Sequence, residues 1–352
     1  MRHGSHIDPP NRFESTHREP DWEHWDGDAE SLPADDSHPI VYLDDDSQSI
    51  ISENDSPDIP FQYSLNPYRG CAHGCAYCYA RNTHEYLGFN AGLDFETKIM
   101  VKHRAAQLFR QFLAKRTEAA SPIAFSGVTD CYQPIERKLR LTRSCLEVAL
   151  DFRQPVGIVT KNAAIVRDLD LLRELSARRL VHVYISITTL DPELARDLEP
   201  RTSIPAARLR AIRELARVGV PVGVMCAPII PGVNSSEVPT ILAAAAEHGA
   251  QTAGKILLRL PQTVLPVFQE WLQRVMPSRA ASILQLIRQT RGGRLNDPQF
   301  GKRMRGAGPI ADQISELFHI FSRKHGLDQP LPPQDGSHFS VPHSGLRQGR
   351  LF

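Results

Sequence analysis

The stretch FQYSLNPYRGCAHGCAYCYA, residues 61–80, joins a short apolar run to a loop that carries three cysteines. The run at residues 61–66 has the length and composition of a β-strand. Cys71, Cys75 and Cys78 follow it within eight residues, whereas the other three of the six cysteines stand singly. We therefore interpret the run as the first strand of the fold and the loop as its functional centre.

Short apolar runs alternate with longer segments of helical period along the rest of the chain. The runs predict six strands, at residues 61–66, 123–128, 156–160, 181–187, 220–226 and 255–260. The segments between them predict helices at residues 97–115, 142–152, 162–176, 205–218 and 236–248. This order favours parallel strands with right-handed crossovers, and six units suit an open barrel better than a closed one of eight. We expect an α/β fold, a partial (β/α)6 TIM-like barrel, with functional residues just after each strand.

The composition changes at both ends of this core, which we expect over residues 59–262. Residues 1–58 lack an apolar period and predict a disordered acidic leader. Helical periods at 264–275, 278–290 and 310–325 predict a C-terminal helical extension over residues 263–327. The glycine-rich basic stretch 291–309 predicts a loop able to close over the barrel mouth or contact an anion. Residues 328–352, rich in Pro, Gly and Ser, predict a flexible tail.

Charge is distributed unevenly along a chain whose formal net charge is +1. Residues 1–60 hold sixteen Asp and Glu against three Arg, so residues 61–352 carry a net charge near +14. Such a surplus favours binding of a polyanion such as nucleic acid, with a solvated arginine-rich surface as the alternative. The sequence has no apolar stretch of membrane-spanning length and no secretory signal, which predicts a cytoplasmic protein without membrane contact. Reduced thiols are expected in that compartment.

Three close cysteines favour a metal centre of one of two kinds. A structural zinc site needs four ligands, and no second Cys/His pair of the usual spacing is present, although His73 and His84 lie nearby. A 4Fe-4S cluster is held by thiolates, and Gly70 and Gly74 give the loop the freedom to wrap around it. Three cysteines leave the fourth iron open for a substrate or cofactor. We favour the cluster and keep zinc as the alternative.

The loop sequence CAHGCAYC resembles the CxxxCxφC motif of the radical S-adenosylmethionine (SAM) superfamily, with Tyr77 at the aromatic position. The segments SLNPYRGC, TDCYQPIE, TKNAAIVRDLDLL, SITTLDPELARDLEPRTS and APIIPGVNSSE extend the resemblance, over about residues 60–326, to the branch similar to spore photoproduct lyase. The resemblance implies a 4Fe-4S cluster on Cys71, Cys75 and Cys78 that binds SAM and cleaves it reductively to a 5′-deoxyadenosyl radical. It also implies an electron donor such as flavodoxin or ferredoxin.

The resemblance assigns SAM contacts to residues after the second, third and fourth strands. Thr129 and Asp130, in SGVTD, lie where the family holds the methionyl amino group of SAM. The alternative is a turn in which Asp130 caps the next segment. Lys161 follows the third strand and Ser186 lies in the fourth, where the family contacts the SAM carboxylate or ribose.

Two later segments complete the implied SAM site. Arg201, in EPRTS, is a candidate for a bidentate contact with the SAM carboxylate, and Glu199 beside it is a candidate neutralising partner. The segment APIIPG, residues 227–232, is expected to support the adenine. Core packing with a proline turn is the alternative for that segment.

One departure from the family bears on the substrate. Spore photoproduct lyase uses a cysteine after the second strand as a hydrogen donor, and Gly127 occupies that place in this chain. Cys131, four residues later, is either a substitute or an ordinary buried thiol. The departure weakens thymine-dimer reversal as a specific prediction.

Three functions are compatible with the sequence. The first is a radical SAM enzyme acting on nucleic acid or a nucleotide, which the resemblance and the basic body favour. The second directs the same chemistry at a protein or a small metabolite. The third is a non-catalytic iron-sulfur protein that transfers electrons. SAM binding separates the third from the other two.

Overall fold

The computed structural model describes residues 2–14, 38–116 and 120–342. Its central feature is a sheet with the strand order β10-β9-β8-β7-β6-β3-β2. Neighbours from β3 to β10 are parallel, and β2 is antiparallel to β3. The strands are β2 (Ile51–Glu53), β3 (Tyr63–Leu65), β6 (Ile123–Phe125), β7 (Val156–Thr160), β8 (Val181–Ser186), β9 (Val222–Ile229) and β10 (Thr252–Leu257).

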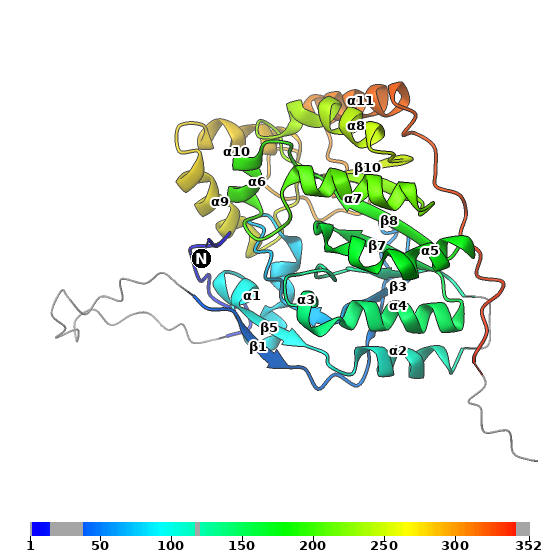
Figure 1. Cartoon of the computed structure of the whole chain (residues 1–352). Helices are drawn as coiled ribbons and strands as arrows, with labels where there is room; N and C mark the ends of the chain where they lie inside the picture. The colour runs from blue at the N-terminus through cyan, green and yellow to red at the C-terminus, as the bar shows by residue number, and fades with distance from the viewer. Residues whose placement is uncertain (1, 15–37, 117–119, 343–352) are drawn as a thin grey trace, which may run out of the picture.

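Helices that follow the strands cover the outer face of the sheet (Figure 1). They are α2 (Ala105–Leu113), α4 (Leu141–Phe152), α5 (Leu169–Ala177), α7 (Pro205–Arg217) and α8 (Val238–Glu247). Their apolar sides form one core with the strands. Buried and half-buried residues alternate along β7 and β8, as expected when one face of a strand packs on helices. The expected α/β class and the partial barrel of six parallel strands are confirmed.

The segment predicted as a disordered leader is ordered where the structure describes it. β1 (Val41–Asp44) pairs in parallel with β5 (Lys98–Val101), and β2 joins the main sheet. Ser5, in residues 2–14, is fully buried. The prediction was therefore wrong for residues 2–14 and 38–58, because main-chain pairing with distant segments does not register as an apolar period. Residues 15–37 lie outside the described residues.

The predicted helix at 97–115 was also wrong in its first third. That stretch forms β5, which pairs with β1 and with β4 (Tyr68–Arg69), before α2 begins. Pairing partners on both sides outweigh the weak local preference for helix. Several short helices escaped the sequence analysis: α1 (Leu93–Thr97), α3 (Glu136–Leu139), α6 (Pro192–Leu198), and the 3-10 turns η3 (Tyr79–Thr83) and η4 (Glu85–Leu87). The 3-10 turn η5 (Ala163–Asp168) lies within the helix predicted at 162–176, and η6 (Ser235–Glu237) lies at the start of the helix predicted at 236–248.

The three predicted C-terminal helices are present as α9 (Val264–Val275), α10 (Ala280–Gln289) and α11 (Pro309–Lys324). They serve two different cores. α9 and α10 pack with residues of the cysteine loop, including Ala76 and Tyr77. α11 lies on α8 and β10 and adds Ile314 and Phe318 to the barrel core. Within the described residues, no helix has the length and apolarity needed to cross a bilayer.

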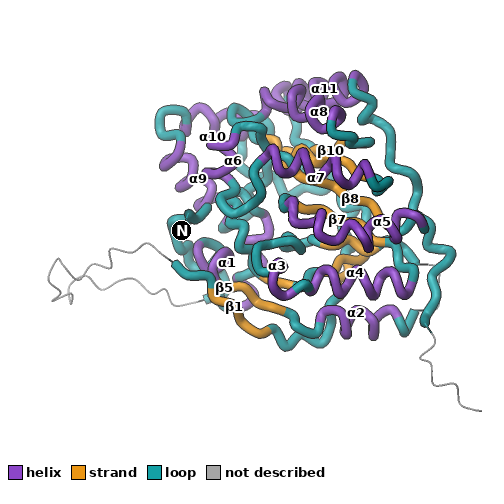
Figure 2. The backbone as a smooth tube through the Cα atoms, viewed as in Figure 1, coloured by secondary structure: helices purple, strands orange, loops and turns teal. Residues whose placement is uncertain are grey.

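The tail beyond α11 packs against the body as far as residue 342. It runs along the side of the molecule past α5 and α4, as the teal segment in Figure 2 shows. The Gln334 side-chain amide donates to the carbonyls of Val156 and Leu180 at 2.8 and 3.1 Å, at the amino ends of β7 and β8. The flexible-tail prediction was wrong for residues 328–342, because polar side chains there satisfy strand-end carbonyls. Residues 343–352 lie outside the described part.

Candidate active site

The cysteine loop is held by main-chain contacts with three distant parts of the fold. The Cys71 amide donates to the carbonyl of Phe95 in α1 at 2.9 Å. The Ala72 amide donates to Gln133 Oε1 at 2.9 Å, and the Ala76 amide donates to the carbonyl of Leu198 in α6 at 3.1 Å. The loop is therefore a fixed part of the structure at the carboxyl side of the barrel.

The three loop thiols are close enough to influence one another. None forms a disulfide; Cys71 and Cys75 are buried, and Cys78 is half-buried. Burial raises the pKa of Cys75 and of Cys78, neighbouring thiols raise it further, and Lys161 acts in the opposite direction. Burial acts to raise the pKa of Cys71, but His73 brings it below the ordinary value. Three gathered thiols with cations beside them fit the donor set of an iron-sulfur cluster.

The loop geometry requires glycine at Gly74. Its φ is +66°, and a Cβ there would lie 2.3 Å from Glu96 Oε2 and 2.6 Å from Arg201 Nη2. The loop therefore packs tightly against this buried ion pair at Gly74.

The two histidines of the zinc alternative are placed differently. His73 lies beside Cys71 and also contacts Asp130 and Asn162. His84 packs against the rings of Phe89 and Phe95. In the described ranges, no three His, Cys, Asp or Glu side chains surround a position for one metal ion. A 4Fe-4S cluster does not need such a position, because each thiolate binds a different iron atom.

A buried carboxylate, Glu96, and two arginines support the cysteine loop. Arg81, which is fully buried, pairs with Glu96 at 2.9 Å and donates to the Cys75 carbonyl at 3.1 Å. Arg201 pairs with the other oxygen of Glu96 at 2.6 Å and also donates to the Ala72 carbonyl. Burial acts to raise the pKa of Glu96, but the surrounding cations, Arg81 foremost, lower it to about 2. The structure thus gives Arg201 a supporting contact with the loop.

The N-terminal segment closes over the same carboxylate. The amides of Gly4 and Ser5 donate to the two oxygens of Glu96 at 3.1 and 2.9 Å. A Cβ at Gly4 would lie 1.7 Å from the Gly74 carbonyl oxygen, so the N-terminal segment is in close contact with the cysteine loop. Residues 2–5 are therefore part of the support of the cysteine loop.

A second buried carboxylate, Glu199, lies on the inner side of the loop. It accepts hydrogen bonds from the hydroxyls of Tyr77 and Thr188 and pairs with the buried Arg208. Burial acts to raise its pKa, but Arg208 and then Lys161 bring it below the ordinary value. Glu199 was expected to neutralise Arg201; that expectation was wrong, because the two side chains diverge to different partners.

Lys161 is a cation near the thiols, on the side of the loop where Tyr77 and Glu199 lie. Its ammonium lies 5.8 Å from the centre of the Tyr77 ring, and its charge acts on Glu199, Cys75 and Cys78. The structure thus brings together Lys161, Tyr77 and the cysteine loop.

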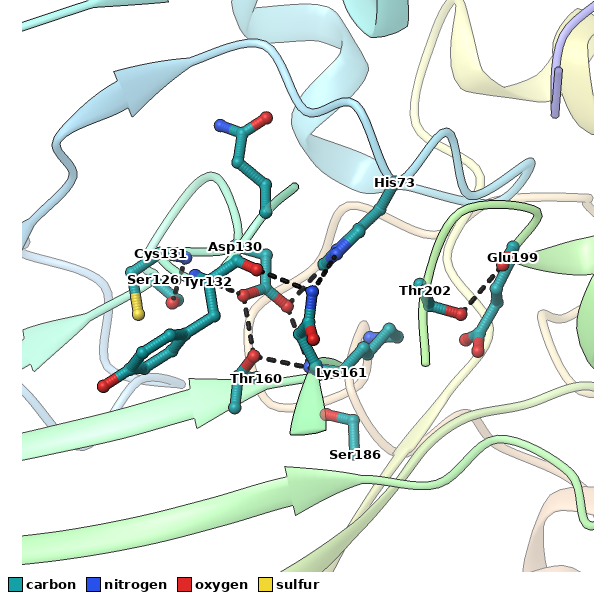
Figure 3. A network of polar contacts seen from close by, with 12 residues as sticks. His73, Ser126, Asp130, Cys131, Tyr132, Thr160, Lys161, Ser186, Glu199 and Thr202 are labelled. Carbon is teal, nitrogen blue, oxygen red and sulfur yellow. Dashed lines mark hydrogen bonds and ion pairs between the residues drawn. The ribbon is translucent and has the colours of Figure 1, made fainter. Parts of the chain in front are cut away.

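Asp130 ties the strand ends to the loop, as Figure 3 shows. Its carboxylate accepts the Thr160 hydroxyl at 2.7 Å and the Lys161 amide at 2.8 Å, and it lies 3.4 Å from His73 Nδ1. Burial acts to raise the pKa of Asp130, but His73 and these bonds lower it to about 2. Asp130 therefore orients both Lys161 and the loop.

The remaining predicted residues lie at or just after the carboxyl ends of β6, β8 and β9. The Thr129 hydroxyl donates to the Tyr68 carbonyl at 3.3 Å, and its amide donates to Asn66 Oδ1 at 3.3 Å. Ser186 is buried at the end of β8, where its carbonyl accepts Arg208 Nη1 at 3.0 Å. The Asn234 side chain holds the 227–232 segment through the Ile230 amide and the Pro228 carbonyl, at 2.6 and 3.0 Å.

The position of the family's hydrogen-donating cysteine leaves little room for a side chain. A Cβ at Gly127 would lie 2.8 Å from the Ser64 Cβ. Cys131 is fully buried in the barrel core, and burial raises the pKa of its thiol well above the ordinary value. The second alternative for Cys131, an ordinary buried thiol, fits this environment.

Sequence reasoning missed the buried charges of the site: Glu96, Arg81 and Arg208. Arg208 lies in the predicted helix at 205–218, where a charged residue usually marks a solvent-facing side, whereas Glu96 and Arg81 lie outside the predicted elements. No local signal distinguishes a charge that pairs in the interior, because its partner is distant in sequence.

The Radical SAM superfamily matches residues 65–245, about half of the chain and the part that contains the cysteine loop and β4 to β9. An uncharacterised protein of Mycobacterium tuberculosis is 33% identical over 278 residues, which cover 78% of this chain and 79% of that protein. An uncharacterised protein of Methanocaldococcus jannaschii is 30% identical over 176 residues, 50% of this chain and 63% of that protein.

Solved structures give the same assignment of the fold. A spore photoproduct lyase variant with bound SAM and dinucleoside spore photoproduct aligns with a TM-score of 0.58 at 19% identity, covering 81% of this chain and 79% of that one. The cysteine loop, its position after the first parallel strand and the open barrel are thus accounted for together, and the chain belongs to the radical SAM superfamily of enzymes.

Proposed function

We propose that this enzyme holds a 4Fe-4S cluster on Cys71, Cys75 and Cys78 and uses it to cleave SAM reductively. The resulting 5′-deoxyadenosyl radical abstracts hydrogen from a bound substrate. The observation that carries the proposal is the gathering of three free thiols, two buried and one half-buried, on one fixed loop beside Lys161. When bound, the cluster supplies the electron and the open coordination position that SAM requires.

The chain's own residues hold and orient SAM in this proposal. Lys161 lies near the thiols and Glu199, since its charge acts to lower the pKa of Cys75 and of Glu199. At this position its ammonium can attract the carboxylate of a SAM molecule bound at the thiols. Tyr77 and Ser186 line the same region, and Thr129 and Asp130 fix the strand ends that carry the contacts. Arg201 acts as a positioning residue, because its guanidinium already binds Glu96 and the loop carbonyls.

An external electron donor, a flavodoxin or a ferredoxin, completes the proposal, because each cleavage consumes one electron. Nucleic acid or a nucleotide is the first candidate substrate, since residues 61–352 carry a net charge near +14. A protein or a small metabolite is the alternative, which a stable protein partner in a pull-down without nucleic acid would favour.

The deciding experiment is anaerobic reconstitution with iron and sulfide, reduction with dithionite, and chromatography of the products formed from SAM. We expect about four iron atoms per chain and cluster-dependent 5′-deoxyadenosine. Cys75→Ala should lose both, whereas Cys145→Ala, which removes a lone buried thiol of α4, should retain both. A four-iron cluster that neither binds nor cleaves SAM would overturn the proposal and favour electron transfer instead.

A further inference from the structure

Arg259 lies at the carboxyl end of the last parallel strand, next to the segment that follows the cysteine loop. It comes two residues after β10 ends. The chain beyond it contacts Asn82 of η3. Asn82 Nδ2 donates to the Pro261 carbonyl at 3.2 Å, and the Thr263 hydroxyl donates to Asn82 Oδ1 at 2.6 Å. Because η3 begins directly after Cys78, Arg259 borders the candidate active site. Ligands of parallel barrels bind at this edge.

Arg259 has no carboxylate within ion-pair distance among the described residues. The polar contact of its guanidinium is a weak one, from Nη1 to Met304 Sδ at 3.5 Å, and its Nε is buried without a partner. Arg259 is half-buried, and a buried donor without a partner is costly unless an anion binds it. Arg291 also has a buried Nε without a partner, but its guanidinium donates to four carbonyls, whereas Arg259 has no such contact.

Two further arginines lie near Arg259, and two acids face the three guanidiniums. Burial lowers the pKa of Arg259, and the nearby Arg303 lowers it more. Burial and the charge of Arg259 lower the pKa of Arg291 to about 10. The facing acids are Asp58, which pairs with Arg303 at 2.6 Å, and Asp297 near Arg291. The three arginines repel one another, and one positive charge is left without a carboxylate.

We propose that Arg259, with Arg303 beside it, binds a phosphate group of the substrate at the barrel mouth. Two neighbouring guanidiniums, one of them without a carboxylate, suit the several oxygens of a phosphate group, and a planar guanidinium binds phosphate oxygens in a bidentate manner. The inference rests on the proposed function and narrows its substrate to a phosphate-bearing molecule. It places the phosphate on the residues after β10, across the barrel mouth from Lys161 after β7.

The first test measures binding of inorganic pyrophosphate to the reconstituted enzyme at low ionic strength by calorimetry. Arg259→Met should weaken binding at least about tenfold, since a hydrogen bond to a charged group is lost. Arg323→Met, which removes an exposed arginine near the end of α11, should bind pyrophosphate as the wild type does. Equal binding by Arg259→Met and the wild type, or no binding by the wild type, would overturn the proposal.

Thermal stability without pyrophosphate provides an independent readout. A ligand-binding arginine that lacks a partner destabilises the free protein, so Arg259→Met should melt at the same or a higher temperature than the wild type. A lower melting temperature together with wild-type binding would assign Arg259 to the fold. If Arg259→Met fails to fold, Arg259→Lys keeps the charge but loses the bidentate geometry, and it should bind pyrophosphate more weakly than the wild type.

Two further probes identify the source of the phosphate. Thymidine 5′-monophosphate represents a free nucleotide, and a short single-stranded oligothymidylate represents nucleic acid. Arg259-dependent binding of either one supports the proposal and names the source; binding of both that is unaffected by Arg259→Met contradicts it. Pyrophosphate binding requires neither SAM nor reduction, so its outcome is independent of the 5′-deoxyadenosine assay that tests the proposed function.

Discussion

Two pairs of arginines border this enzyme's candidate active site, and their surroundings differ. Arg81 and Arg208 each meet a buried carboxylate, Glu96 and Glu199 respectively. Arg291, which is buried, and Arg259, which is half-buried, meet none among the described residues, and in both the Nε is buried without a partner. The first pair fixes the cysteine loop and Tyr77, whereas the second leaves a positive surplus at the barrel mouth. Paired charges thus support the cysteine loop, and charges without a carboxylate lie after β10.

Removing the carboxylate from the first pair should produce the largest effect. Glu96→Gln leaves Arg81 and Arg201 buried without a counter-charge, and we expect a loss of about 3–5 kcal/mol in the free energy of unfolding. Urea denaturation measures it. Glu214→Gln is the matched control, because its partner Arg217 is exposed and such pairs contribute at most about 1 kcal/mol. Equal losses in the two variants would contradict the supporting role of Glu96.

The pH dependence of stability tests the same Glu96 ion pairs at acid pH. The pKa of Glu96 is about 2 in the folded chain, below its usual 4.5. The unfolded chain therefore takes up the proton first, and stability is lost as pH falls from about 4.5 to 2, by roughly 3 kcal/mol for this group. Glu96→Gln should show a shallower acid slope than the wild type in denaturation of the cluster-free chain. Parallel slopes would mean that Glu96 titrates normally.

Replacing either arginine at the barrel mouth should change the free energy of unfolding less than Glu96→Gln does, and Arg291 and Arg259 should differ from each other. Arg291 donates to the carbonyls of Leu257, Leu258, Lys302 and Arg303, so it closes the 291–309 loop onto β10. Arg291→Met should therefore lower the free energy of unfolding by about 1–3 kcal/mol. Arg259→Met, which removes no carbonyl contact, should not. Comparable losses in both variants would show that the two residues share a structural role.

The predictions from sequence were best where the signal was local. Strands β7 and β8 and helices α4, α7 and α9 lie within a residue or two of their expected bounds, because apolar period and chain order suffice to define them. β1 and β5 were missed, since each is a strand only through main-chain pairing with segments distant in sequence. Residues 2–14 were missed for a similar reason: Gly4 and Ser5 are ordered by Glu96, more than ninety positions away.

The sequence by itself determined the radical SAM class, the three cysteines and the parallel barrel, because a short motif and a repeating strand-helix order are written in consecutive residues. Only the tertiary structure decided which charges are paired. It directed Arg201 to Glu96 and Glu199 to Arg208, and left Arg259 without a carboxylate among the described residues. The reason is physical: the free energy of a buried charge depends on partners that folding brings from distant parts of the chain.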